Sequence, residues 1–295
     1  MTDKREYRGL SHHAETTTAA AMLAPILVAV ILLRVWPALD ALWVSLTSPR
    51  EGGGLDISAY IDLLTDSNFL GSLAVTALYS VIVNPLQIAV ALALALLFSR
   101  RLPAVGVWRT FVLLPIVIPQ SISAVIWGVA MRPDGPINGV LQALGLPPQP
   151  LLTAPSEALW CIIVIVSWVG VGYWMTFLIA GLQDIPPDIY EAALLDGANS
   201  WKRFRYITLP LLRRPLLFVL VTDTVSNFLV FAPVQILTNG GPDGSTDLVM
   251  FEIFNRAFNF GDNQGAAAGT VILVLLVMAV VLVQFRMLQS KDVDQ

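Results

Sequence analysis

Polar side chains interrupt a long apolar segment at residues 222–227. Asp223 and Asn227 are four residues apart, so on a helix they share one face, and Gln235 follows two turns later. An amide or carboxylate in an apolar segment is destabilising without a hydrogen-bonding partner. A ligand with several hydroxyl groups could supply that partner, so this face is a candidate binding surface.

Three other apolar segments carry groups of the same kind. They contain Asn84 and Gln87, then Gln120, Ser123 and Trp127, and finally Tyr173 and Trp174. Amides hydrogen-bond hydroxyl groups, and aromatic rings stack on the C–H face of a sugar. With Asp223, Asn227 and Gln235, these residues are our candidates for a solute pathway. Two other interpretations stay open, because such groups also join packed helices and Asp223 could pair with Arg34 or with a partner chain.

The motifs of common catalytic and metal sites are absent from the sequence. Cys161 is the single cysteine, and His12 and His13 lie together in the N-terminal tail, so no cysteine–histidine set of metal ligands exists. There is no GxxxxGK[ST] loop, no GxSxG elbow and no HExxH helix. We therefore expect neither an enzyme nor a metal or cofactor site, and the chain cannot bind ATP by itself.

The overall composition is that of a membrane protein. Of 295 residues, 56% are hydrophobic and 13% charged, and the mean hydropathy is +0.72. These values exclude a water-soluble enzyme. The formal net charge of −4 gives no basic surface for nucleic acid.

Six apolar intervals are long enough to cross a bilayer, which requires roughly 20 residues of helix. They span about 16–46, 67–99, 105–131, 158–183, 211–237 and 263–286. We expect an all-α, six-span transmembrane domain over 16–288, with polar tails at 1–15 and 289–295. The first interval is longer than a signal-peptide core and has no convincing cleavage site, so it is predicted to be retained.

The basic residues predict the orientation of these spans. If the N-terminus is cytoplasmic, 13 of the 17 Lys and Arg residues lie on the inside and one, Arg34, lies within the first span. The outside loops then hold Arg50, Arg132 and Arg256. This positive-inside asymmetry places both termini in the cytoplasm, and we expect a multi-pass protein of the bacterial inner membrane.

The predicted cytoplasmic segment 184–210 has the pattern of two short helices. Pro187 suits a first helical turn, and Gly197 suits the left-handed residue that ends a helix. Asn199 or Ser200 can cap a second helix that extends to Tyr206, and Pro210 fits the opening turn of the fifth span.

That second helix would carry Trp201, Phe204 and Arg205 on one face. Such a helix could insert into a groove of another protein, whereas an interfacial anchor is the alternative.

The same segment resembles the EAA loop of bacterial ATP-binding-cassette importer permeases. The resemblance is carried by Glu191-Ala192-Ala193, Asp196-Gly197-Ala198 and Ile207-Thr208-Leu209-Pro210. Other motifs resemble the maltose-type carbohydrate and glycerol-3-phosphate branch of that family. They are Trp108-Arg109-Thr110-Phe111, Leu114-Pro115, Gly135-Pro136-Ile137-Asn138 and Gly240-Gly241-Pro242.

The resemblance implies the six-helix fold of type I importer permeases, with 184–210 as the EAA coupling loop. Residues that would couple the chain to an ATPase are Glu191, Ala192, Ala193, Asp196, Gly197, Ala198, Trp201, Phe204 and Arg205. It also implies a second homologous permease as heterodimer partner, two ATPase subunits that bind ATP and Mg, an extracytoplasmic solute-binding protein and surrounding lipid.

The function implied is import of a polar organic solute. A sugar or a glycerol-phosphate-type compound, such as glycerol-3-phosphate or a glycerophosphodiester, is expected from the branch motifs. One alternative is an importer branch for amino acids, peptides or an inorganic anion. The other is a channel or scaffold that does not use ATP, against which the EAA-like loop counts.

Overall fold

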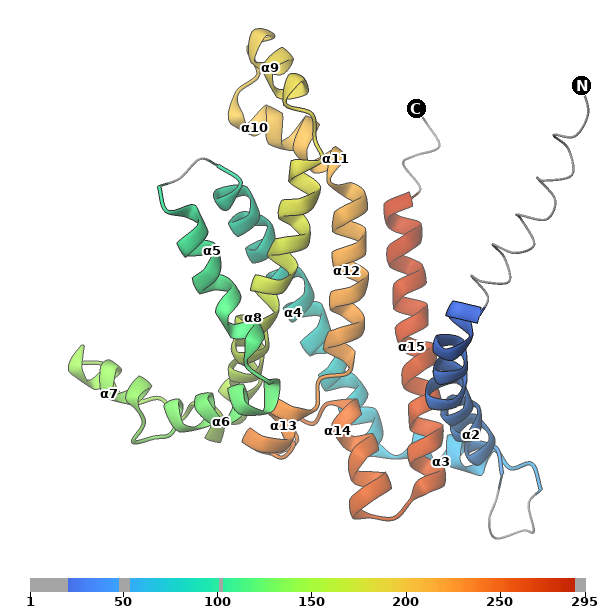
Figure 1. Ribbon diagram of the computed structural model, residues 1–295. Helices are drawn as coiled ribbons and strands as arrows, with labels where there is room; N and C mark the ends of the chain where they lie inside the picture. Colours follow the sequence, from blue (N-terminus) through green and yellow to red (C-terminus); the bar gives the residue numbers. More distant parts are fainter. Residues whose placement is uncertain (1–20, 48–53, 101–102, 290–295) are drawn as a thin grey trace, which may run out of the picture.

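The computed structural model describes residues 21–47, 54–100 and 103–289, and the statements below concern these residues. The expected all-α architecture is confirmed in them (Figure 1). Five helices are long and apolar enough to cross a membrane: Ala21–Ser45, Ser67–Phe98, Pro155–Gln183, Arg213–Leu237 and Asn263–Met287. The pair Val105–Val117 and Gln120–Ala130, bent by 100°, raises the number to six in the described residues if it is counted as one broken span. The predicted tail 1–15 and residues 290–295 lie outside the described part.

The elements follow one another in a simple order. The first span ends in α2 (Trp36–Ser45), and the following helices are α3 (Ser58–Thr65), α4 (Ser67–Phe98), α5 (Val105–Leu113), α6 (Gln120–Ala130), α7 (Pro136–Ala143) and α8 (Pro155–Gln183). The remaining ones are α9 (Pro187–Leu195), α10 (Ser200–Arg203), α11 (Leu209–Leu211), α12 (Arg213–Phe228), α13 (Ala232–Leu237), α14 (Val249–Phe254) and α15 (Asn263–Gln289). Three π-helical turns, Ile31–Val35, Phe204–Thr208 and Asn255–Asn259, lie among the described helices.

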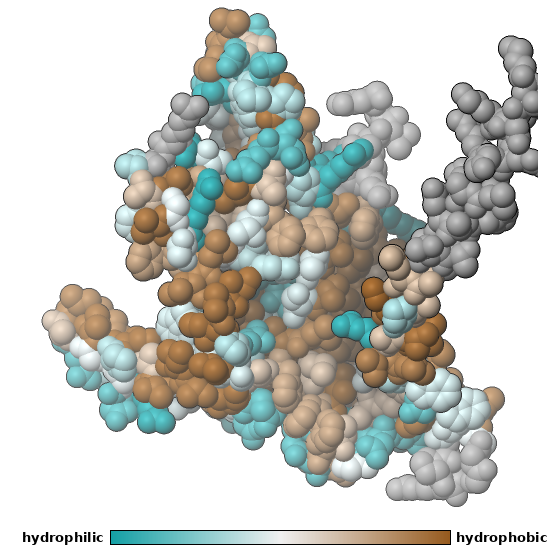
Figure 2. Space-filling view, viewed as in Figure 1, coloured by the Kyte–Doolittle hydropathy of each residue, from teal (hydrophilic) through white to brown (hydrophobic). Residues whose placement is uncertain are grey.

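The short helices gather at two opposite ends of the long ones. Helices α9 and α10 project beyond one end, whereas α3, α6, α7, α13 and α14 lie at the other (Figure 1). We call these the α9 end and the α14 end. Hydrophobic side chains cover the middle of the visible surface and hydrophilic ones gather towards both ends (Figure 2). This distribution is the one that a bilayer around the middle of the long helices requires.

The third predicted span, 105–131, is not one continuous helix, and the expectation is corrected. After α5 a 3-10 turn ends at Val117, and α6 then leaves at a bend of 100°. Pro119 causes the break, because a residue before proline is disfavoured in the helical region. Ile118 is accordingly extended, with φ −87° and ψ 121°.

Helices α4 and α8 pack together along their length and form the centre of the bundle. Tyr79 and Val83 of α4 are fully buried against Ile162 and Ile163 of α8. Gly172 of α8 permits a close approach of α5, since a Cβ there would lie 2.2 Å from the carbonyl oxygen of Val112. The bundle therefore holds four helices around one buried axis, on which the polar candidates also lie.

A cluster of charged side chains joins helices at the α14 end. The Arg256 guanidinium contacts the carboxylate of Asp66, and its Nε lies 2.8 Å from Oε1 of Glu252. Asp66 also accepts a hydrogen bond from the backbone N–H of Asn68 at the start of α4. That hydrogen bond and the neighbouring Arg256 lower the pKa of Asp66. The cluster ties the N-terminus of α4 to α14 outside the apolar zone.

Candidate functional site

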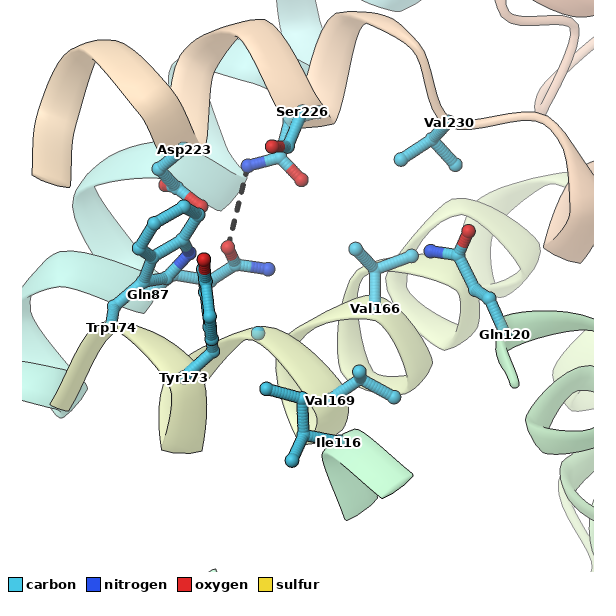
Figure 3. Close-up of a pocket in the computed structure, with 12 residues that line it drawn as sticks. Gln87, Ile116, Gln120, Val166, Val169, Tyr173, Trp174, Asp223, Ser226 and Val230 are labelled. Atoms are coloured by element: carbon cyan, nitrogen blue, oxygen red, sulfur yellow. Dashed lines mark hydrogen bonds between the residues drawn. The ribbon is translucent and has the colours of Figure 1, made fainter. Parts of the chain in front are cut away.

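A cavity of about 310 Å³ lies where α4, α8 and α12 face the bend between α5 and α6. Six of the ten candidate pathway residues line it: Gln87, Gln120, Tyr173, Trp174, Asp223 and Asn227. Figure 3 shows five of them, Gln87, Gln120, Tyr173, Trp174 and Asp223, which come from four elements far apart in the sequence. Ser226 and the apolar residues Ile116, Val166, Val169, Gly170 and Val230 complete the lining.

The other four candidates lie elsewhere. Asn84 is packed behind the cavity, and Ser123 is fully buried on α6. Trp127 meets Trp168 edge-on at 5.6 Å between ring centroids and lines a separate, mainly apolar cavity of about 500 Å³. Gln235 belongs to α13. The breaks at Pro119 and after Phe228 turn α6 and α13 away, so a stripe drawn along a straight helix does not reach the cavity.

Asn227 is the centre of a hydrogen-bond network between α12 and α4. Its Nδ2 donates to Oδ1 of Asn84 at 2.7 Å and to Oε1 of Gln87 at 3.3 Å. The hydroxyl of Tyr79 donates to Oδ1 of Asn227 at 3.3 Å. Asn227 is 2% exposed, so its amide is satisfied inside the chain. The partner that the sequence analysis requires for this amide is therefore supplied by the protein itself.

The network continues to two further helices. Gln87 donates from Nε2 to Ser167 of α8 at 3.2 Å, and Gln284 of α15 donates to Thr224 at 2.8 Å. Thr224 also accepts from Asn84 at 3.3 Å. Buried polar networks of this kind fix the relative positions of packed helices. The cavity wall is therefore held in place by the same amides that border it.

Asp223 differs from Asn227 because its carboxylate is not fully satisfied. The side chain is 1% exposed and lies beside Trp174 and Asn227, and its Oδ2 has no hydrogen-bonding partner. An ion pair with Arg34, one of the alternatives from the sequence, is absent from the described structure. Arg34 lies instead on the first span and is exposed. The carboxylate is thus a free acceptor at the cavity.

Aromatic rings form the part of the wall next to Asp223. Tyr173 and Trp174 meet edge-on with their centroids 4.7 Å apart, and Phe177 lies 5.0 Å from Tyr173. Tyr173 and Trp174 reach from α8 towards Asp223 (Figure 3). A carboxylate, amides, a phenol and ring faces around one space can hold a small hydroxyl-bearing molecule. Sequence reasoning missed the apolar members, such as Val166 and Gly170, because nothing distinguishes them from packing residues.

The loop between α8 and α12 adopts the turn that its sequence predicts. Gly197 has φ +74°, the left-handed conformation that favours glycine. Its N–H bonds to the carbonyl of Leu194, and the N–H of Ala198 bonds to that of Ala193. These two bonds form a Schellman motif that ends α9. Asn199 then caps α10 by accepting from the N–H of Lys202 at 2.8 Å.

The predicted second helix of this loop does not end at Tyr206. It continues through the π-helical turn Phe204–Thr208 into α11 and is directly followed by α12. The hydroxyls of Tyr190 and Thr208, 3.0 Å apart, link α9 to this turn. The loop is therefore continuous with α12, the helix that carries Asp223.

The outer surface of the loop exposes aromatic groups. Trp201 is 68% exposed and its ring lies 5.6 Å from that of Phe204, while Tyr206 is 73% exposed beneath the guanidinium of Arg205. Leu195, at the end of α9, is 91% exposed. Clustered exposed aromatic and aliphatic groups beyond the membrane zone are typical of a protein contact.

Long apolar helices around a buried polar cavity, with a loop of short helices at one end, are the architecture expected of a membrane permease. The chain belongs to the family described as "Binding-protein-dependent transport system inner membrane component", whose model matches residues 14–291. It is therefore a multi-pass inner-membrane permease subunit of an ATP-binding-cassette importer and a transport protein rather than an enzyme.

Similar proteins share almost the full length of the chain. The trehalose/maltose transport system permease protein MalF of Thermococcus litoralis is 33% identical over 97% of this chain and 96% of its own. The sn-glycerol-3-phosphate transport system permease protein UgpA of Agrobacterium fabrum is 30% identical, with coverages of 92% and 94%. The lactose transport system permease protein LacF of Rhizobium radiobacter is 33% identical, with coverages of 88% and 89%.

Two solved structures share the fold. A chain of a bacterial transporter for import of the acidic polysaccharide alginate superposes with a TM-score of 0.85 at 21% identity, covering 96% of this chain and 99% of its own. A second structure, of the alginate transporter with a periplasmic protein bound to an alginate pentasaccharide, gives a TM-score of 0.80, again at 21% identity. It covers 97% of this chain and 98% of its own.

Proposed function

We propose that this permease moves an uncharged sugar through the cavity bordered by Asp223. The proposal rests mainly on one observation. The carboxylate oxygen Oδ2 of Asp223 has no hydrogen-bonding partner, and it borders the same cavity as the ring pair of Tyr173 and Trp174. A carboxylate accepts hydrogen bonds from sugar hydroxyls, and these rings offer flat apolar surfaces. Ser226, Gln87 and Gln120 add polar groups to the same space.

The charge of the lining separates the two solute classes suggested by the sequence. Asp223 is its one charged residue, and the described lining contains no Lys or Arg. A phosphate ester would meet an uncompensated negative charge there, which is unfavourable in a partly dehydrated site. The names of the trehalose/maltose and lactose relatives agree with a sugar, whereas the glycerol-3-phosphate relatives support the rival.

The solute class is tested by stimulation of ATP hydrolysis. The complete complex would be reconstituted with its solute-binding protein and given a neutral disaccharide, glycerol-3-phosphate or an amino acid. We expect stimulation by a neutral sugar and none by the other two. Stimulation by glycerol-3-phosphate alone would contradict the sugar assignment, and stimulation by the amino acid alone would favour another importer branch.

The α9 end is proposed to face the cytoplasm, with both termini there. The support is the sequence distribution of Lys and Arg, of which 13 fall in the segments predicted to be cytoplasmic, including the loop of α9 and α10. A reporter fused after Ser200 should then lie in the cytoplasm and one fused after Asp243 outside. The reverse result would overturn the orientation and, with it, the role of the loop.

The exposed loop of α9 and α10 is proposed as the contact with the ATPase subunits. Glu191, Ala192, Ala193, Asp196, Gly197 and Ala198 would set its shape, and Trp201, Phe204 and Arg205 would fill the ATPase groove. The partners would be a second homologous permease, two ATPase subunits that hold ATP and Mg, and an extracytoplasmic solute-binding protein. Closure of the ATPase pair would move this stiff loop and, through the π-helical turn, α12.

A further inference from the structure

Arg34 lies close to the middle of the first span. In the described residues that helix runs from Ala21 to Ser45, and Arg34 is about 16 Å along the axis from its last residue, while the apolar interval of the sequence reaches back to residue 16. The apolar core of a bilayer is about 30 Å thick. Arg34 therefore starts inside the apolar core rather than at a surface, where an arginine is costly without a partner.

Arg34 has no partner within the part of the chain that the structure describes. It is exposed and has no ion pair or hydrogen bond to another described residue. Asp40, the other charged residue of the span, lies about 9 Å further along the axis and on a different face. A charge at this depth is normally turned towards protein or a water-filled cavity and is paired there.

The backbone around Arg34 is also short of hydrogen bonds. The chain forms a π-helical turn at Ile31–Val35, in which the N–H of Trp36 bonds to the carbonyl of Ile31. Pro37 has no N–H, so the carbonyls of Leu32 and Leu33 lose their regular helical donors. These two residues are 58% and 75% exposed. Five N–H donors and two under-satisfied carbonyls thus lie side by side at a depth where lipid offers neither partner.

We propose that this polar patch, defined by Leu32, Leu33 and Arg34, binds a membrane-spanning helix of the second permease subunit, which presents a carboxylate to Arg34. The inference rests on the proposed function in that it takes a second permease as given. A second copy of this chain does not fit, because Asp223 is 1% exposed inside its own bundle and Asp40 lies at another depth. Arg34 would then favour pairing with the second permease subunit over pairing with another copy of this chain.

The test is recovery of the second permease with tagged chain from detergent-solubilised membranes. Arg34→Leu should lower recovery at least tenfold, and Arg34→Lys, which keeps the charge, should retain most of it. The matched control is Leu27→Ala, an exposed apolar position on the same span. Because leucine inserts into membranes more readily than arginine, failure of insertion cannot mimic the loss. Changing the partner's mid-membrane carboxylate to its amide should reproduce the effect of Arg34→Leu.

A photoreactive amino acid at Leu33 gives a second readout. We expect a crosslink to the second permease, whereas a crosslink to lipid only, or to another copy of this chain, would overturn the proposal. Unchanged recovery with Arg34→Leu would overturn it as well. If the unaltered chain itself fails to recover a second permease, the proposed assembly fails, and that outcome is distinct from failure of the Arg34 contact alone.

Discussion

Replacing Gly197 with valine should reduce ATP-driven uptake about tenfold or more while the protein remains in the membrane. A Cβ at this position meets no neighbouring atom, so the effect comes from the backbone. Valine at φ +74° is strained by about 1–3 kcal/mol, and 1.4 kcal/mol already changes an equilibrium tenfold. The turn between α9 and α10 would relax, and the loop would no longer fit its groove. Uptake and ATP hydrolysis by the reconstituted complex should become uncoupled.

Gly145→Val is a matched control for this variant. Gly145 has φ +76°, ends α7 with the same pair of Schellman bonds and also has open space around its Cβ. It lies at the α14 end, away from the loop. We expect Gly145→Val to keep hydrolysis coupled to uptake. Equal uptake losses in both variants would indicate a general folding defect, and normal uptake in Gly197→Val would remove the coupling role of the turn.

Replacing Asp223 with asparagine should raise the solute concentration needed for half-maximal uptake about tenfold or more. A hydrogen bond to a charged group contributes roughly 1.5–3 kcal/mol, and asparagine keeps the shape while removing the charge. Complex assembly and basal hydrolysis should persist, because the unpaired Oδ2 atom bonds no protein group. The measurement is uptake across a full concentration series of the transported sugar.

Two neighbouring variants separate solute binding from helix packing. Ser226→Ala should have little effect, since Oγ of Ser226 bonds to the carbonyl of Thr222 on its own helix at 2.9 Å. Asn227→Ala should lower the yield and thermal stability of the complex, because Tyr79, Asn84 and Gln87 lose a shared partner. An uptake curve for Asp223→Asn that matches the parent would show that the carboxylate is not a solute contact.

Local patterns in the sequence were sufficient to predict the long helices and the turn of the loop. Apolar intervals located the long helices, because a bilayer sets a minimum length that few other structures need. Gly197 and Asn199 marked the turn and the cap of the loop, because these conformations depend on one or two residues. The i, i+4 spacing of Asp223 and Asn227 likewise placed both at the cavity.

The sequence did not show which helix faces pack together or which residues line the cavity, because long-range packing determines both. Asn227 meets Asn84, 143 residues away, and no periodicity indicates which two polar faces pair. Pro119 breaks the third span, but no local pattern gives the 100° angle that turns α6, with Trp127, away from the line of α5. The apolar residues of the cavity have the same composition as packing residues. The roles of Asp223 and Asn227 therefore diverged only once their neighbours were known.

Uptake into proteoliposomes tests most directly whether the chain is a permease of an ATP-driven importer. The complex would be reconstituted with ATP and Mg at the α9 end and with loaded solute-binding protein at the α14 end. We expect labelled sugar to accumulate against its gradient and to stop doing so when either ATP or the binding protein is omitted. Equilibration of the sugar at the same rate without ATP and binding protein would identify a passive channel and contradict this function.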